Sequence, residues 1–139
     1  MSAVTGFDNE VGSELDRQPL RRLHDSVRRQ TTRLVQPLSE ADATVQSMPD
    51  ASPAKWHLAH TTWFFEAMVL EPYCAGYRSP QPDYRRLFNS YYESLGERHP
   101  RPQRGLLTRP SLDEVLAYRA HVDRAIAGLF DSEPGPEAL

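Results

Sequence analysis

The sequence has very little cysteine or lysine and no long apolar run. Its single cysteine, Cys74, excludes an internal disulfide framework. Lys55 is the only lysine, so nearly all the positive charge of the chain comes from arginine. No apolar stretch approaches the ~20 residues that a bilayer span requires, and the patch from Trp63 to Leu70 is interrupted by Glu66. We therefore expect a chain that does not enter a membrane.

The beginning of the chain also lacks the features of a secretory signal. Residues 1–16 are polar and acidic, with neither a basic segment nor an apolar core. Together with the single cysteine, this favours the cytoplasm. The formal net charge of −3 is unlike the basic charge that nucleic-acid-binding domains carry, so we expect no nucleic-acid partner.

The charge is nevertheless unevenly distributed along the chain. Between residues 76 and 110, seven arginines stand against three acidic residues, which gives a local charge of +4. A basic segment in an acidic chain is typical of a site for a small anionic ligand or an acidic partner. A solvated helix face followed by an arginine-rich loop would have the same composition, so composition alone leaves both interpretations open.

Helical periodicity is the dominant pattern, and no segment alternates as a strand would. Proline and glycine punctuate the periodic segments. The expected helices are 19–36, a short turn at 39–44, 53–71, 82–95 and 112–130.

Three helix starts carry capping signals. Ser39 with Asp42, and Ser111 with Glu114, have the spacing of capping boxes. Ser52, which precedes a proline, is a candidate N-cap for the second long helix. These elements predict an all-α, up-down helical bundle that is incomplete, with three long helices and a short helix in a long crossover. We expect a disordered lead-in over 1–16, the helical domain over 17–131 and a flexible tail over 132–139.

The histidines are candidates for metal chemistry. His60 shares one face of the second long helix with aromatic residues, and a neutral imidazole facing a bundle core is a common transition-metal ligand. Judged by spacing alone, a core histidine that only packs and forms hydrogen bonds is the commoner case. The other histidines are expected off that face or at helix surfaces: His24, His57, His99 and His121.

A second candidate is a pair of arginines in a proline-rich loop. Arg101 and Arg104 are three residues apart within residues 99–105, a segment that also contains Pro100 and Pro102. A fixed guanidinium binds a carboxylate through two hydrogen bonds, and the prolines reduce the entropy lost on holding it there. A solvent-exposed loop without function fits the composition equally well.

Four stretches together resemble the amino-terminal, DinB-like domain of the sulfoxide synthases of ergothioneine biosynthesis (the EgtB family). The resemblance extends over roughly residues 19–130. The stretches that carry it are 45–66 (VQSMPDASPAKWHLAHTTWFFE), 87–92 (LFNSYY), 98–107 (RHPRPQRGLL) and 114–123 (EVLAYRAHVD).

The resemblance implies a fold, a reaction and a set of site residues. In that family a DinB-like helical bundle precedes a formylglycine-generating-enzyme-like domain, and a non-haem iron(II) lies between them. The enzymes use dioxygen to join the sulfur of γ-glutamylcysteine, or of cysteine, to the imidazole of trimethylhistidine, forming a sulfoxide. By resemblance, His60 is one iron ligand, and Arg101 and Arg104 hold the carboxylates of the thiol substrate.

The sequence departs from the family pattern after the third long helix. The other two iron ligands of the family lie on a further helix with an HxxxH motif, and both that helix and the second domain are missing here. An iron(II) site of this kind needs three protein ligands. We therefore expect an amino-terminal fragment of an iron-dependent oxidoreductase that alone neither binds iron tightly nor catalyses sulfoxide formation, with the fourth helix and second domain as its partners.

Two alternatives remain open from the sequence. The chain is a stand-alone DinB-like binding module that docks on a separate partner through the groove where a fourth helix would lie. Alternatively, it is a thiol transferase of the same superfamily with its own three-histidine set, which would recruit His24 or His121.

Overall fold

The computed structural model describes residues 17–90 and 98–132. Within these ranges the regular structure is entirely helical, so the predicted all-α class is confirmed. The expected lead-in over 1–16, the end of the helix predicted over 82–95, and the tail after residue 132 lie outside the described residues.

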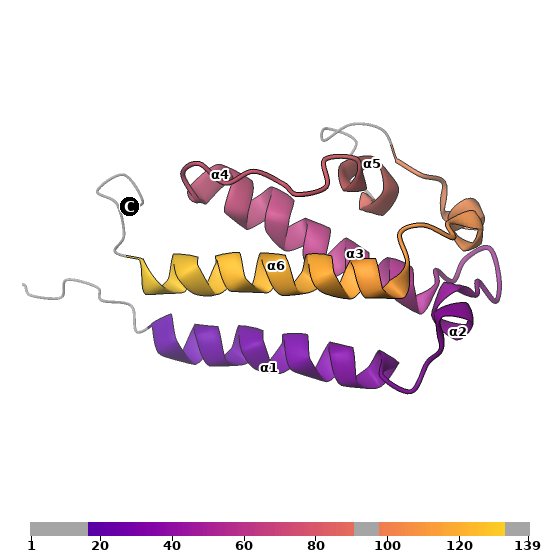
Figure 1. The fold of residues 1–139 in the computed structure, drawn as a ribbon, viewed down its shortest axis with the longest axis horizontal. Helices are drawn as coiled ribbons and strands as arrows, with labels where there is room; N and C mark the ends of the chain where they lie inside the picture. The colour runs from indigo at the N-terminus through magenta and orange to yellow at the C-terminus, as the bar shows by residue number, and fades with distance from the viewer. Residues whose placement is uncertain (1–16, 91–97, 133–139) are drawn as a thin grey trace, which may run out of the picture.

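Three long helical segments form the body of the molecule (Figure 1). Helix α1 (Arg17–Val35) lies beside α6 (Leu112–Asp131), and α3 (Ala54–Phe65) packs against both of them. α3 continues into a π-helical turn, η1 (Glu66–Leu70), and the short α4 (Glu71–Tyr73). The remaining elements are α2 (Glu40–Thr44), α5 (Tyr84–Phe88) and the 3-10 helix η3 (Arg101–Leu106).

The hydrophobic core lies between α3 and α6, which share the largest interface among the described elements. Trp63 and Leu58 of α3 face Val115 and Val122 of α6, and all four side chains are almost completely buried. Each such side chain stabilises the fold by about 1.5–3 kcal/mol through its removal from water. Tyr118 of α6 is buried as well.

Helix α1 packs on this core through polar groups. Its one buried residue is Arg28, whose Nε donates to Asp123 at 2.7 Å and whose Nη2 donates to the Thr62 hydroxyl at 2.8 Å. Arg119 donates from Nη2 to the Arg28 carbonyl at 3.3 Å. Both guanidinium groups lie inside the bundle, where a buried charge requires such partners.

The apolar stripe of α1 faces outward. Leu20, Leu23 and Val27 are 59, 61 and 52 % exposed. They line a groove of about 680 Å³ whose opposite wall includes Phe65 of α3 and Leu129 of α6. The groove is therefore open to solvent along α1.

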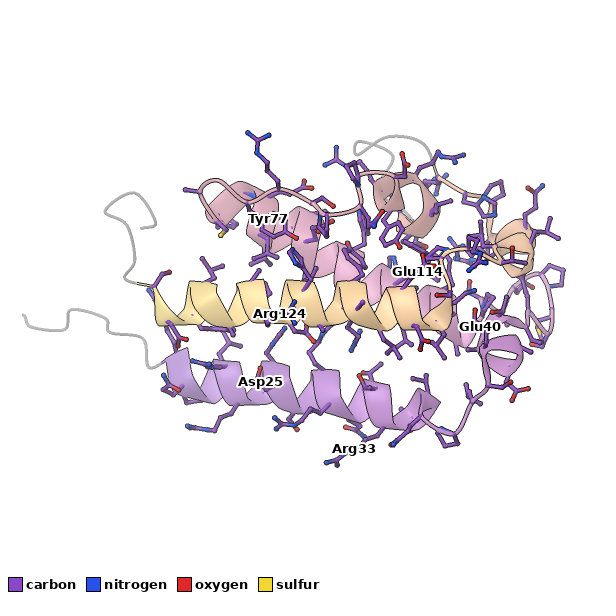
Figure 2. The ribbon with its side chains drawn as sticks, in the orientation of Figure 1. Asp25, Arg33, Glu40, Tyr77, Glu114 and Arg124 are labelled. Atoms are coloured by element: carbon purple, nitrogen blue, oxygen red, sulfur yellow. The ribbon has the colours of Figure 1, made fainter. Side chains whose placement is uncertain are left out.

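Two predicted caps are confirmed. The Ser39 hydroxyl accepts from the Asp42 amide, and the Asp42 carboxylate accepts from the Ser39 amide. The Ser111 hydroxyl caps α6 by accepting from the Glu114 amide at 3.1 Å. Glu40 and Glu114 lie at the same end of the bundle, where α2 meets the beginning of α6 (Figure 2). There, a carboxylate oxygen of Glu40 accepts from the backbone amide of the first α6 residue at 2.6 Å.

Two helix boundaries differ from expectation. Pro53, not Ser52, occupies the N-cap position of α3, and Ser52 instead accepts a hydrogen bond from Arg104 at 2.8 Å. Helix α5 ends at Phe88, because Asn89 has extended backbone angles. The side chains of α3 take the carbonyls at this end of α5, which a longer helix would need for its own hydrogen bonds. None of the helices in the described part of the chain is long and apolar enough to cross a bilayer.

Candidate functional site

His60 lies on α3, half-buried among aromatic rings. Its imidazole stacks on Trp56 with ring centroids 4.7 Å apart and on Trp63 at 6.0 Å. Nδ1 is 2.6 Å from the carbonyl oxygen of Phe88, and since a carbonyl only accepts, Nδ1 carries the proton. In the neutral ring, Nε2 is then the nitrogen with a free lone pair, which is the form of histidine that binds metals.

The electrostatic surroundings keep His60 neutral. Burial lowers the pKa of its imidazole, the hydrogen bond to Phe88 opposes that shift, and the positive charge of Arg104 adds to the lowering. His57, one turn earlier and solvent-exposed, has a pKa lowered by partial desolvation and by the charges of His60, Arg104 and Arg101. The positive charge of Arg104 therefore lowers the pKa of both histidines, and that of Arg101 lowers the pKa of His57.

The side chain of Arg104 connects the proline-rich segment (residues 99–105) to α3. Its guanidinium carbon is 3.5 Å from the centroid of the Trp56 ring, and its side chain is only 4 % exposed. Nη1 donates to the Ser52 hydroxyl. A desolvated guanidinium on an indole face is held by about 2 kcal/mol. The Trp56 ring thus contacts both His60 and Arg104, so these two predicted site residues share one aromatic support.

Arg101 and Arg104 line one pocket, as the spacing of the arginine pair would require. The pocket has a volume of about 460 Å³. It lies between η3 and the turn that precedes α3. Its described lining is Pro49, Asp50, Ser90, Arg98, His99, Pro100, Arg101, Pro102 and Arg104.

The relation of His60 to this pocket is indirect. His60 is not among the described lining residues, and its link to the pocket runs through Trp56 and Arg104. The fold therefore brings the two arginines together at one pocket. His60 is separated from that pocket by Trp56 and by Arg104, the buried arginine of the pair.

The other histidines lie in separate surroundings. His24 packs against Phe65 and Phe130 at the bottom of the α1 groove. His121 lies beside Tyr77, with ring centroids 6.1 Å apart. Across residues 17–90 and 98–132, no three side chains of histidine, cysteine, aspartate or glutamate come together as a metal site. The described residues thus fit an iron ion only as the source of one ligand.

Sequence reasoning missed two residues that line the pocket and a third, Gln46, that hydrogen-bonds to the Arg101 carbonyl beside it. Arg98, Asp50 and Gln46 were not singled out, although Arg98 belongs to the basic segment that was. Arg98 donates to the Ser90 carbonyl at 2.7 Å. Asp50 and Gln46 precede α3 in a stretch without periodicity. Only the resemblance, which covers 45–66, contained a signal for them.

A buried carboxylate forms a second polar cluster, away from the pocket. Glu66, the first residue of η1, is 2 % exposed and accepts hydrogen bonds from the hydroxyls of Tyr77, Ser79 and Tyr118. Burial raises the pKa of both tyrosines well above the ordinary value, and Glu66 raises them further. Figure 2 shows Tyr77 in the segment that follows α4 and runs back along the bundle. The cluster fastens that segment to α3 and α6.

Comparison with known families fits this architecture. A sequence model of the DinB superfamily matches residues 23–135. The chain therefore belongs to the DinB superfamily, and the predicted DinB-like fold is confirmed. No curated protein matches the sequence significantly. The match defines the superfamily and leaves the sulfoxide synthase family as a prediction.

Proposed function

We propose that this domain binds the thiol substrate of an iron-dependent sulfoxide synthase of the ergothioneine pathway and contributes His60 as one of three iron ligands. The observation that carries the proposal is the shared pocket of Arg101 and Arg104, with Arg104 stacked on the same indole ring as His60. The remaining two imidazoles and the pocket for trimethylhistidine would come from a histidine-rich helix and a formylglycine-generating-enzyme-like domain.

The chemistry of the arginine pocket supports a carboxylate ligand. Arg104 is preorganised by the Trp56 ring and by Ser52, so little side-chain entropy is lost when it receives an anion. Arg101 is half-buried at the same pocket, and its backbone carbonyl is fixed by a hydrogen bond from Gln46 at 2.8 Å. Charge-assisted hydrogen bonds from two guanidinium groups favour γ-glutamylcysteine or cysteine over a neutral thiol.

The state of His60 supports the metal role. The Phe88 carbonyl fixes the Nδ1 proton and leaves Nε2 available, which is how metal-binding histidines are oriented in proteins. Iron(II), when bound, would supply dioxygen activation and thiolate coordination. This chain would orient the thiol by its carboxylate and hold one neutral imidazole at the metal.

A titration with substrate tests the arginine part of the proposal. Isothermal titration of the chain with cysteine and with γ-glutamylcysteine should give saturable binding. Removing one charge-assisted contact costs about 1.5–3 kcal/mol, so Arg101→Ala should weaken binding about 10- to 100-fold. Arg33→Ala is the matched control, because Arg33 points away from the bundle on α1 and should leave binding unchanged (Figure 2). Equal binding by wild type and Arg101→Ala would contradict the proposal.

An iron titration tests the histidine part. The chain is mixed with a polypeptide that carries the histidine-rich helix and second domain, and iron(II) binding is measured anaerobically. His60→Ala should abolish the site, whereas His24→Ala and His121→Ala should have little effect. Loss of iron on substitution of His24 or His121 would instead favour a thiol transferase with its own histidine set.

The groove on α1 favours a second candidate, a binding module that docks on a separate partner chain. Its exposed leucines and its apolar wall from Phe65 and Leu129 fit one side of an amphipathic helix. Leu23→Asp should abolish docking in either case. A docked partner that restores neither iron nor thiol binding would identify the module, and one that restores both would identify the enzyme part.

A further inference from the structure

The arginine pocket lies between two segments that are far apart in the sequence. One wall is η3, and the other is the tight turn at residues 48–51, in which the Ala51 amide donates to the Met48 carbonyl at 3.1 Å. The hydrogen bond from Arg104 to Ser52 joins the two segments, but it uses a guanidinium that the proposed function assigns to the ligand. A pocket built in this way keeps its shape during binding only if a second contact holds the walls together.

The side-chain amide of Gln46 makes that second contact. Its Nε2 donates to the Arg101 carbonyl at 2.8 Å, and its Oε1 accepts from the Gly105 amide at 2.7 Å. Both partners are backbone groups of η3. The same Nε2 also donates to the Pro49 carbonyl of the turn at 3.4 Å. One amide therefore binds the backbone of both walls.

The two contacts on η3 also fix how this helix is rotated about its axis. A 3-10 helix has three residues per turn, so side chains three positions apart project from the same side. Arg101 and Arg104 have this spacing. The rotation of η3 therefore decides whether both guanidinium groups face the pocket, and Gln46 holds the backbone at residue 101 and again at residue 105.

The approach of Gln46 to η3 is close enough to require glycine at position 105. A Cβ atom there would lie 2.7 Å from the Gln46 Cβ and 3.1 Å from its Oε1. The Gln46 side chain therefore fits against η3 only because residue 105 has no side chain.

We propose that Gln46 is a positioning residue for the thiol ligand, whose amide holds η3 against the turn so that Arg101 and Arg104 meet one carboxylate together. The inference rests on the proposed function and adds a residue that affects the affinity although it is not among the described residues that line the pocket. Binding to groups that are already ordered loses less conformational entropy than binding to groups that the ligand must order. Loss of the bridge should therefore weaken binding although both arginines are still present.

A matched pair of substitutions tests this assignment in titrations with cysteine. Gln46→Met removes the amide and keeps a side chain of similar length, whereas Gln103→Met makes the same change at an exposed position of η3. Gln46→Met should weaken cysteine binding about tenfold, the order expected when the ligand must order arginine side chains, and Gln103→Met should leave it unchanged. Cooperative thermal unfolding above the titration temperature shows that Gln46→Met is folded. If it is not folded, Gln46→Asn replaces it, because that amide is too short by one methylene to reach both walls.

The background Arg101→Lys separates positioning from a general effect on the fold. Lysine carries its charge on a flexible stem, so its contact with a carboxylate depends less on the rotation of η3. Gln46→Met should weaken binding by about threefold or less in this background, because the two sites are coupled. An equal loss in both backgrounds, or wild-type affinity in Gln46→Met, overturns the role of Gln46 and leaves the proposed function intact. If wild type does not bind cysteine, the proposed function and this inference fail together.

Discussion

The contact between Arg104 and Trp56 makes a quantitative prediction about how the site is held. We consider the substitutions Trp56→Leu and Arg104→Met, which remove the ring and the charge and leave apolar side chains in their place. Trp56→Leu loses core packing and the indole hydrogen bond to the Leu87 carbonyl. Such a change costs about 3–5 kcal/mol of unfolding free energy. Arg104→Met loses the Ser52 contact and costs about 1–3 kcal/mol.

The coupling between the two changes is the informative quantity. With the guanidinium carbon 3.5 Å from the ring centroid and the side chain 4 % exposed, the cation–π contact is worth about 1–2 kcal/mol. The double variant should therefore be less destabilised than the sum of the single variants by that amount. Urea unfolding of all four proteins, followed by circular dichroism, measures it.

Additivity within about 0.3 kcal/mol would refute the reasoning, because residues in contact do not behave as independent sites. If Trp56→Leu is too unstable to measure, Trp56→Phe replaces it. That variant keeps a ring under Arg104, so it should retain about half of the coupling or more.

Three further predictions concern other parts of the structure. Glu66→Ala should destabilise the fold by about 3–5 kcal/mol because three hydroxyls lose their acceptor. In the wild type, Tyr77 and Tyr118 keep their protons in the folded state above about pH 10, whereas the unfolded chain releases them, so the melting temperature falls as the pH rises. Glu66→Ala removes part of the cause of these raised pKa values, so this fall in melting temperature should be smaller in the variant. An NMR titration should find the pKa of the His60 imidazole below about 6.5. The neutral ring therefore contributes stability that is present above about pH 6.5 and is lost as the pH falls through the pKa of His60 in the folded state. An imidazole that titrates above about 6.5 would contradict the account. Gly105→Ala should cost about 1–3 kcal/mol by displacing Gln46, whereas Gly128→Ala, which meets nothing within 4 Å, should be neutral or stabilising in thermal unfolding.

The sequence predicted those features that depend on local rules. The caps at Ser39 and Ser111 follow from short-range hydrogen bonding, and both are formed. The meeting of Arg101 and Arg104 at one pocket follows from their separation by one helical turn in a stiff segment. Their role and that of His60 remain predictions.

The sequence did not predict the features that depend on partners far away in the chain. Leu20, Leu23 and Val27 of α1 are exposed, and Arg28 is the buried residue of that helix. The acceptor of the Arg28 side chain, Asp123, is 95 positions away in the sequence, and the periodicity of α1 does not indicate this pairing. Likewise, α5 ends early because Trp56 and His60 take the carbonyls of its last residues, and those donors belong to another helix.

The π-helical turn η1 was not predicted from the sequence for the same reason. Helix propensity describes residues 53–71 as one continuous helix, and nothing local marks Glu66 as its break. The buried position of Glu66 depends on hydroxyls from Tyr77 and Tyr118, which come from other segments. Asp50 was missed because a turn residue becomes a pocket residue only through the Gln46 hydrogen bonds to η3.

The account claims above all that a thiol carboxylate binds between two arginines beside His60. The most direct test is an NMR titration that follows the Nε–H signals of Arg101 and Arg104 and the ring signals of His60 as cysteine is added. The account predicts saturable shifts of both arginine signals with one common affinity, and a smaller shift of His60 through Trp56. Shifts confined to the α1 groove at Leu23 and His24, or no saturable shift at either arginine, would contradict it.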